Sequence, residues 1–497
     1  MPRVDSDPAF AQVLGANIAP RKDTMLQGFW LFVGLVVVWV VNHLEVSVTI
    51  FVGALIMAVA SLYPSYLWCA RKALGMPIFP LFALTYLWTY ALQLLDSHPQ
   101  VVTYSVDRQL FASVSVAGFL ALGTWVWYQF VKSTPEPPQY YRAFNSRQGE
   151  VFLLFSLALS VFFDMNTLAG WFSLEGGVFT LIRAMMIAIN ALAIFSLAYN
   201  WGAQTSSKAI TSTFLILLLS YIVTSAVSLL LVGGLTAFLL ATIAFILGRR
   251  QIPWLPIALA LLCFGFLHMG KSEMRSQYWQ PYQIHHVQPW QYPAWYGEWV
   301  GYSLQNSNAT AEAEEDSQSP LERASLIHLL LMAQAKTPND VSYLAGKTYA
   351  IIPQLLVPRF LNPQKIRSHE GTYLLNIHYG LQTRADTEIT VIGWGLLNEA
   401  YANFGLVGCA GLAIILGAGY GQVTRWSMNT PILSARFLFA ILIIGFAFQT
   451  EYSAGVYVAA LFQSTIPLIA ITFLFMNTYK TGYLIKINST NLKSNLK

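Results

Sequence analysis

The residues best suited to chemistry gather in one polar stretch of an otherwise apolar chain. Between positions 347 and 384, Glu370 is the only acid. The basic residues of this stretch are Lys347, Arg359, Lys365, Arg367 and Arg384. Arginine offers a planar fork of donors that matches phosphate oxygens, and it keeps its proton near neutral pH. The stretch therefore predicts a site for an anionic ligand, with pairing to lipid headgroups or simple solvation of a loop as the alternative.

Two further arginines stand outside this stretch but could serve the same ligand. Arg183 lies about five residues inside an apolar run, which corresponds to roughly 8 Å of helix. A charge at that depth faces a cavity or a partner, unless it snorkels to the interface. Arg323 falls in the first turn of a helix that we expect to start at Ser319, because Ser319 and Glu322 have capping-box spacing. Arg323 then faces either water or a binding site.

Group transfer at such a site also needs a base within hydrogen-bond reach of the acceptor hydroxyl. Glu399 is the first candidate because it opens an apolar run and would lie at the membrane surface, although an acid there can also cap the helix N-terminus. Asp386, His378 and then His369 follow. His285 and His286 have no third ligand at metal spacing. We expect neither a metal ion nor another cofactor.

The composition shows where these residues lie. Of 497 residues, 56% are hydrophobic and only 10% are charged, and the mean hydropathy is +0.52. A soluble protein would be about a quarter charged. The chain is therefore predicted to be an all-α polytopic membrane protein with the lipid bilayer as a partner. The net charge of +5 follows from topology, described next, and indicates no nucleic-acid partner.

Apolar runs predict about twelve transmembrane helices, since a span takes about 20 residues. The runs are 26–41, 49–68, 78–95, 110–131, 151–164, 178–201, 210–232, 235–247, 254–269, 399–420, 435–448 and 456–476. The fifth, eighth and eleventh runs are short. They indicate either tilted helices or misplaced boundaries.

The distribution of lysine and arginine predicts the orientation. With a cytoplasmic N-terminus, sixteen of these residues fall in cytoplasmic segments, and Arg108 alone falls in the short loops opposite. The predicted organisation is a cytoplasmic tail (1–24), nine spans (25–270), one large extracytoplasmic loop (271–398), three spans (399–478) and a basic cytoplasmic tail (479–497). Aromatic residues crowd 278–299, either as an interfacial belt or as faces for sugar rings. An acidic connector follows at 308–319.

The order of these features resembles the Wzy-type O-antigen and exopolysaccharide polymerases and, more distantly, the O-antigen ligases. The resemblance rests on a Pro-Arg pair followed by proline and a basic residue, and then on a polar stretch that leads into a span. These residues are Pro358, Arg359, Pro363, Lys365, Asn398, Glu399, Tyr401, Asn403, Phe404, Gly405 and Gly408. It covers roughly 323–411 closely and the rest of the chain as a hydropathy profile.

The resemblance implies a GT-C-like, metal-independent glycosyltransferase of a bacterial inner membrane. Its substrate would be a polyprenyl-diphosphate-linked oligosaccharide, with a flippase and a chain-length regulator as candidate further partners. The ligases carry a histidine ahead of the span after their large loop, where this chain has Gly393 and Trp394. Polymerisation is therefore the first hypothesis and ligation the second. A flippase or solute transporter and a scaffold are alternatives from other classes, although no self-similar halves indicate a transporter.

Overall fold

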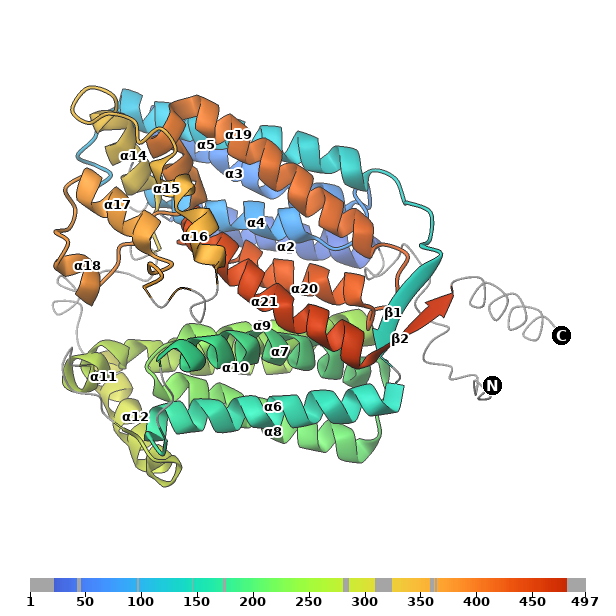
Figure 1. Ribbon diagram of the computed structural model, residues 1–497. Coiled ribbons are helices and arrows are strands. Elements are labelled where there is room, and N and C mark those ends of the chain that lie inside the picture. The colour runs from blue at the N-terminus through green and yellow to red at the C-terminus, as the bar shows by residue number, and fades with distance from the viewer. Residues whose placement is uncertain are drawn as a thin grey trace.

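The computed structural model describes residues 22–42, 46–95, 98–144, 146–172, 176–279, 286–308, 324–357, 362 and 364–480. This part of the chain is almost entirely helical, and long apolar helices run side by side (Figure 1). The prediction of an all-α polytopic membrane protein is confirmed at that level.

The helices of the first half are α2 (Lys22–Val41), α3 (Val48–Cys69), α4 (Ile78–Tyr86), α5 (Val106–Val131), α6 (Ser146–Ala169), α7 (Gly176–Ala203), α8 (Lys208–Val227), α9 (Leu231–Arg249) and α10 (Trp254–Met269). α4 continues through a π-helical turn, η1 (Leu87–Ala91), and a 3-10 turn, η2 (Leu92–Leu94). Then come α11 (Lys271–Tyr278), η3 (Pro289–Gln291), α12 (Tyr292–Asn308), α14 (Ile327–Lys336), α15 (Lys347–Ala350), α16 (Ile352–Leu356), α17 (Glu370–His378), α18 (Asp386–Ile389), α19 (Leu396–Ser427), α20 (Ala435–Ala447) and α21 (Ala454–Leu474).

All twelve predicted spans fall on helices. Within the described residues, nine helices are long and apolar enough to cross a membrane, and α10 with α11 forms a tenth candidate bent by 49°. The segment 78–94 and α20 are apolar but shorter. Two runs that are short in sequence belong to full-length helices, because α6 and α9 extend beyond their apolar centres. The eleventh run, α20, is short in the structure as well.

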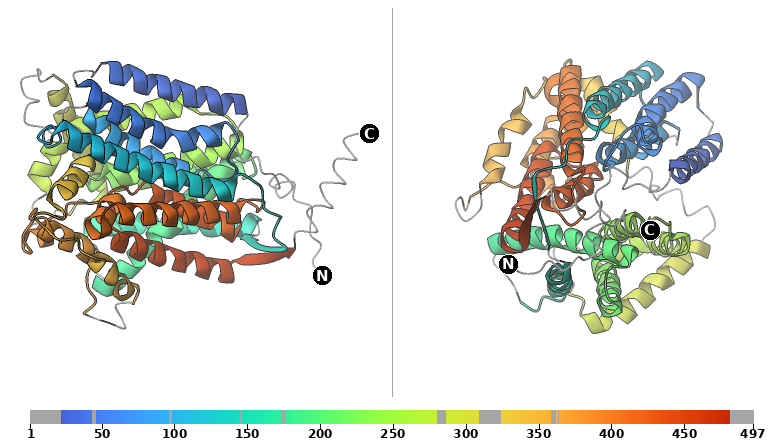
Figure 2. Two further views of the ribbon diagram at one scale, coloured as in Figure 1. Left: turned by 90° about the horizontal axis from the view of Figure 1, so that it is seen from above. Right: turned by 90° about the vertical axis from the view of Figure 1, so that its right-hand side faces the viewer.

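The helices form two bundles (Figures 1 and 2). One contains α2–α5, α14 and α19–α21, and the other contains α6–α12. α7 joins them because it packs on α9 within its own bundle and also contacts α20 and α21. Segments α11–α18 lie at one end of the bundles, which we call the loop end. The opposite end, which we call the hairpin end, carries a two-stranded sheet.

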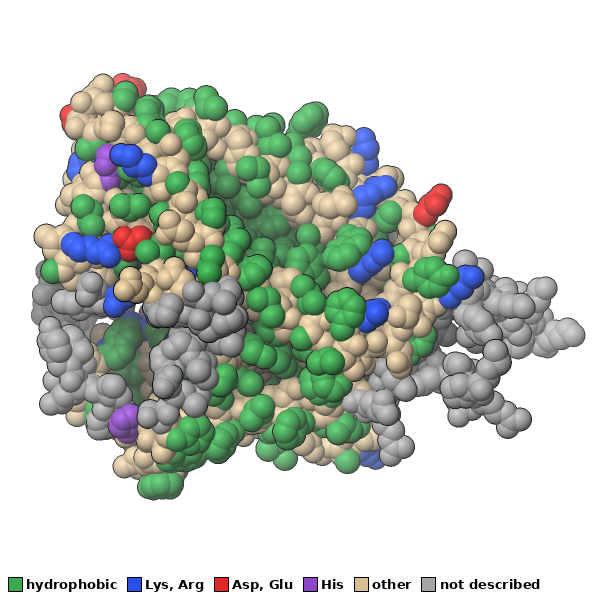
Figure 3. Space-filling model, in the orientation of Figure 1, with side chains coloured by type: hydrophobic (Ala, Val, Ile, Leu, Met, Phe, Trp, Pro, Cys, Tyr) green, Lys and Arg blue, Asp and Glu red, His purple; other side chains and the backbone are tan. Residues whose placement is uncertain are grey.

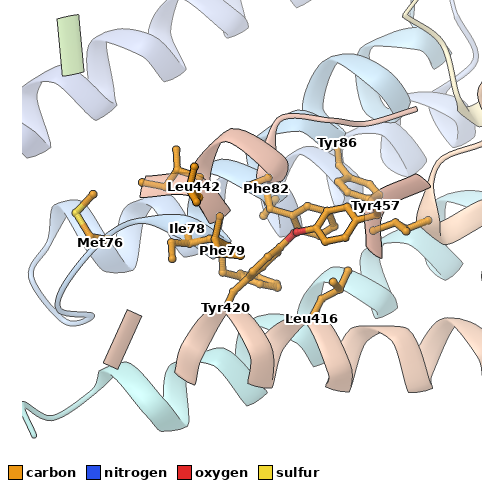
Figure 4. Packing of buried hydrophobic residues seen from close by; sticks show 14 of the residues in the cluster. Met76, Ile78, Phe79, Phe82, Tyr86, Leu416, Tyr420, Leu442 and Tyr457 are labelled. Carbon is orange, nitrogen blue, oxygen red and sulfur yellow. The ribbon is translucent and has the colours of Figure 1, made fainter. Parts of the chain in front are cut away.

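Aromatic packing and close helix contact hold the first bundle together. Phe79, Phe82 and Tyr86 pack against Tyr420 and Tyr457 (Figure 4), whose hydroxyls are 2.9 Å apart. α19 lies tightly along α5, since a Cβ at position 417 would lie only 2.5 Å from the carbonyl oxygen of position 123. Small residues permit such approach where lipid removes the usual hydrophobic drive for association.

The sheet at the hairpin end joins distant parts of the chain. β1 (Tyr140–Phe144) pairs antiparallel with β2 (Met476–Lys480), and Tyr140 is opposite Lys480. A bridge between Ala143 and Ser434 ties β1 to the start of α20. This sheet lies outside the sequence expectation, which contained helices alone.

Part of the large loop folds into the first bundle. Leu326, Leu329, Leu330 and Met332 form a buried apolar face, and α14 packs against α5 and α19. The described helix begins at Ile327, whereas the expected start at Ser319 lies outside the described residues. α14 therefore gives the loop end a rigid base.

Candidate functional site

The polar residues at the start of α19 are buried and satisfied, so they build the site rather than contact a ligand. Asn398 accepts a hydrogen bond from the Tyr90 hydroxyl at 2.9 Å and donates to the Leu326 carbonyl oxygen at 2.9 Å. Asn403 donates to the Thr348 hydroxyl at 2.8 Å and accepts from the Gly346 N–H at 3.0 Å. These side chains attach α14 and α15 to the start of α19.

Glu399 is fully buried. Its Oε2 accepts the N–H of Ala454, the first residue of α21, at 2.5 Å. The Thr348 hydroxyl lies near the same carboxylate. The other oxygen of Glu399, Oε1, accepts no hydrogen bond from a described residue. Glu399 was expected at the membrane surface, with capping of its own helix as the alternative. It instead holds the N-terminus of a different helix.

The connection 448–453, between α20 and α21, forms the centre of the loop end. Its Glu451 carbonyl oxygen accepts the Gly395 N–H at 3.3 Å, and its Ser453 hydroxyl accepts a hydrogen bond from Thr372 of α17 at 3.0 Å. Gly395 has φ +73°, and a Cβ there would lie 2.7 Å from the Thr450 carbonyl oxygen. Only glycine fits both the conformation and the space.

Arg183 reaches this connection from the second bundle. It lies on the second turn of α7, ahead of the apolar window that begins at Met185, and its side chain is exposed. Arg183 interacts electrostatically with Asp164 of α6 and with Tyr452. Burial raises the pKa of the Tyr452 phenol, Arg183 opposes that rise, and the carboxylate of Glu451 adds to it. A cation and a carboxylate thus act electrostatically, in opposite directions, on one phenol.

Glu451 combines solvent access with partial desolvation. Its side chain is exposed, yet the surrounding protein raises the pKa of its carboxyl above the ordinary value. A carboxylate that is reachable and more basic than usual suits proton abstraction better than one sealed in the interior. Figure 3 shows a hollow at the loop end between the two bundles, with basic side chains along its edge and hydrophobic ones inside.

Sequence inspection did not select Glu451 or Tyr452. The available signal was weak, because a single acid in a short connection between two predicted spans matches no motif. That Arg183 acts on the same tyrosine is evident only once α7 is packed against α20 and α21.

Among the described basic residues of the polar stretch, Arg384 is engaged by the protein itself. Arg384 makes a bidentate ion pair with Glu370, at 2.8 and 3.1 Å, and its guanidinium lies 5.2 Å from the Tyr373 ring centroid. Arg367 is exposed and Lys365 is half-buried. Arg323 and Arg359 lie outside the described residues. Arg384 would have to exchange or share its carboxylate to bind a phosphate.

The other candidate bases have structural partners. Asp386 is exposed and accepts hydrogen bonds from the Thr383 N–H at 2.8 Å and hydroxyl at 2.6 Å, which lower the pKa of its carboxyl. His378 Nε2 lies 2.8 Å from the Ser342 carbonyl oxygen. The His369 ring stacks on Tyr373, and partial burial lowers the pKa of its imidazole. None of the three adjoins Glu451 in a described contact.

No group of three histidine, cysteine, aspartate or glutamate side chains converges as a metal site within the part of the chain that the structure describes. Arg183, Tyr452 and Glu451 are the loop-end residues that the electrostatic interactions bring together. Comparison of the chain with family models, with curated proteins and with solved structures finds no match.

Proposed function

We propose that this protein is a glycosyltransferase that polymerises polyprenyl-diphosphate-linked oligosaccharide repeat units into a surface polysaccharide. The observation that carries the proposal is that Arg183 and Glu451, from different bundles, both interact with Tyr452 at the loop end. This pairs a fixed cation with an accessible carboxylate, which are the two groups that such a transfer needs. The resemblance in 323–411 to the Wzy-type polymerases supports the same function.

The proposed setting is a bacterial inner membrane with the hairpin end in the cytoplasm. Basic residues concentrate at the hairpin end, which carries Arg71, Lys72, Lys132, Arg249, Arg250 and Arg425. Positively charged residues favour the cytoplasmic side. The loop end would then face the compartment outside the cytoplasm, where a lipid-linked repeat unit is extended, within a GT-C-like arrangement of twelve spans.

The proposed reaction transfers a glycan from its lipid carrier to a hydroxyl of a new repeat unit. Glu451 accepts the hydroxyl proton while the hydroxyl oxygen forms a bond to the anomeric carbon. The bond between that carbon and the diphosphate oxygen breaks, and its electron pair leaves with the diphosphate. Arg183 stabilises the charge that develops on the leaving oxygens. Arg323, Arg359, Lys365, Arg367 and Arg384 are further candidates for diphosphate binding.

The test is chain extension by purified protein supplied with native lipid-linked repeat unit. Arg183→Gln should reduce extension strongly, whereas Arg108→Gln, an exposed arginine at the same end, should not. The proposal is wrong if no extension occurs in vitro and cells carrying Arg183→Gln or Arg359→Gln make wild-type polysaccharide. Movement of lipid-linked sugar across liposomes without bond formation would favour a transporter instead.

Ligation is separated from polymerisation by the banding of surface polysaccharide on gels. Loss of a polymerase leaves product with a single repeat unit. Loss of a ligase leaves long chains on the lipid carrier.

A further inference from the structure

An apolar groove opens on the bundle surface at the hairpin end, far from the residues assigned to transfer. Its volume is about 490 Å³. Phe439 of α20 and Leu468, Ile469 and Phe473 of α21 form its walls. Phe473 and Ile469 are largely exposed, so this groove faces the space that lipid chains occupy around the spans.

Two arginines lie on the rim of this groove. Arg142 donates to the Thr472 carbonyl oxygen at 3.2 Å, and its guanidinium lies 4.5 Å from the Phe473 ring centroid. The Arg436 guanidinium lies 5.3 Å from the Trp426 ring centroid. No ion pair of either arginine with a described carboxylate is present. Both are half-buried, so two positive charges are partly withdrawn from water without an ion pair to any carboxylate that the structure describes.

Strand β1 and the start of α20 place these two arginines on the same groove. Arg142 is in β1 and pairs in register with Thr478 of β2, which also lines the groove. The Ala143–Ser434 bridge places β1 against the start of α20, where Arg436 is the second residue. The N-terminus of α20 adds the positive end of its dipole to the same rim.

Two other basic residues at the hairpin end donate hydrogen bonds to oxygen atoms of the protein and do not line this groove. Arg425 donates to the Phe130 carbonyl oxygen at 3.1 Å and the Ser133 carbonyl oxygen at 3.4 Å. Lys132 donates to Gln129 at 2.7 Å. Arg142 and Arg436 differ from Arg425 and Lys132 in lining this apolar groove.

We propose that this groove binds an anionic phospholipid of the leaflet at the hairpin end. The phosphate contacts Arg142 and Arg436, and one acyl chain lies along Phe439 and Ile469. A free phosphate ion would satisfy the charges but leave the apolar walls uncovered. A zwitterionic lipid would cover the walls but leave the net charge of the rim uncompensated.

The experiment measures lipid retention by the full-length protein in mixed vesicles or nanodiscs of phosphatidylglycerol and phosphatidylcholine, followed by native mass spectrometry. Wild type should retain phosphatidylglycerol selectively. The double variant Arg142→Gln/Arg436→Gln should bind it about thirtyfold more weakly, since each basic residue near an anionic surface contributes a several-fold effect. Lys132→Gln, at the same end but outside the groove, should retain wild-type selectivity.

Three outcomes would overturn the proposal. They are no lipid preference in wild type, equal loss of preference in Lys132→Gln, and displacement of phosphatidylglycerol by inorganic phosphate at ordinary ionic strength. The single variant Arg436→Gln is the control for misfolding, because the Arg436 side chain makes a ring contact but no described hydrogen bond. This variant should elute and melt like wild type in phosphatidylcholine and still lose part of the selectivity. Unchanged selectivity in the folded single and double variants also contradicts the site.

Discussion

Two glutamates of the loop end should respond differently to the same substitution. Glu451→Gln removes an accessible carboxylate beside Tyr452 and Arg183. Glu399→Gln changes a buried carboxylate whose Oε2 holds the Ala454 N–H. The substitution replaces each carboxylate by an amide that retains one acceptor oxygen. The size and hydrogen-bond acceptance of the new side chain therefore nearly match those of the old one. The comparison therefore separates proton transfer from structural support.

The expected magnitudes follow from these positions. Loss of a general base lowers the rate by about 10²–10⁴-fold, and an exposed Glu451→Gln should change stability by less than about 0.5 kcal/mol. Glu399→Gln retains an acceptor for Ala454 but loses the charge-assisted part of that bond, at a cost of about 1 kcal/mol. Glu399→Ala leaves the Ala454 N–H without its acceptor and should cost about 1–3 kcal/mol.

The assay is chain extension across pH, together with thermal unfolding of each purified variant. Because desolvation raises the pKa of the Glu451 carboxyl, its ionised form increases over a pH interval higher than that of an ordinary glutamate. Extension should increase over that interval in wild type and in Glu399→Gln. The assignment is refuted if Glu451→Gln keeps both full rate and this pH dependence while Glu399→Gln, folded and stable, loses activity.

Three further predictions test neighbouring features. Burial and the stacked His98 ring lower the pKa of His328 to about 4, so the unfolded state takes up a proton that the native state resists. Stability should fall by at most about 3 kcal/mol as pH drops from about 6.5 to about 4, and His328→Gln should remove that dependence in pH-resolved unfolding. Gly395→Ala should cost about 1–3 kcal/mol because of its positive φ, whereas Gly411→Ala, with open space around it, should be neutral or stabilising; equal melting temperatures would contradict this. Arg384→Gln should cost less than about 1 kcal/mol, since the Arg384 side chain is 55% exposed although its partner Glu370 is only 20% exposed; a strong loss of chain extension at unchanged stability would indicate diphosphate binding.

The sequence was sufficient to predict the helices because membrane spans are long apolar runs. The predicted runs agree with the helices at their centres but differ from them at some ends. α6 begins at Ser146 and includes Arg147 and Glu150, and polar residues at a helix end carry no hydropathy signal. The β1–β2 sheet could not be predicted, since two five-residue strands of mixed polarity pair across nearly the whole chain.

The residue types suggested a chemistry for the candidate site, but they carried no information on its arrangement. An arginine near the start of a span suggested a cavity or a partner, and the structure places Arg183 near Asp164 and Tyr452. The role of Glu399 depended on whether another segment would cover it. The first residue of α21 does so through the Ala454 N–H, and no local pattern near position 399 encodes that contact. Arg323 and Arg359, outside the described residues, keep the status of predictions.

The connection 448–453 explains why residues so far apart in sequence would act together. Gly395 and Thr372 donate hydrogen bonds to it, and Glu399 accepts one from Ala454 directly after it. Arg183 of the second bundle acts electrostatically on its Tyr452. The relative position of Arg183 and Glu451 therefore depends on how α7 packs against α20 and α21. Phe195 and Phe437 are part of that contact, with ring centroids 6.1 Å apart. Close-packed protein interiors transmit small displacements. A change in the packing of Phe195 on Phe437 would therefore alter the position of Arg183 relative to Glu451 without a contact to either residue.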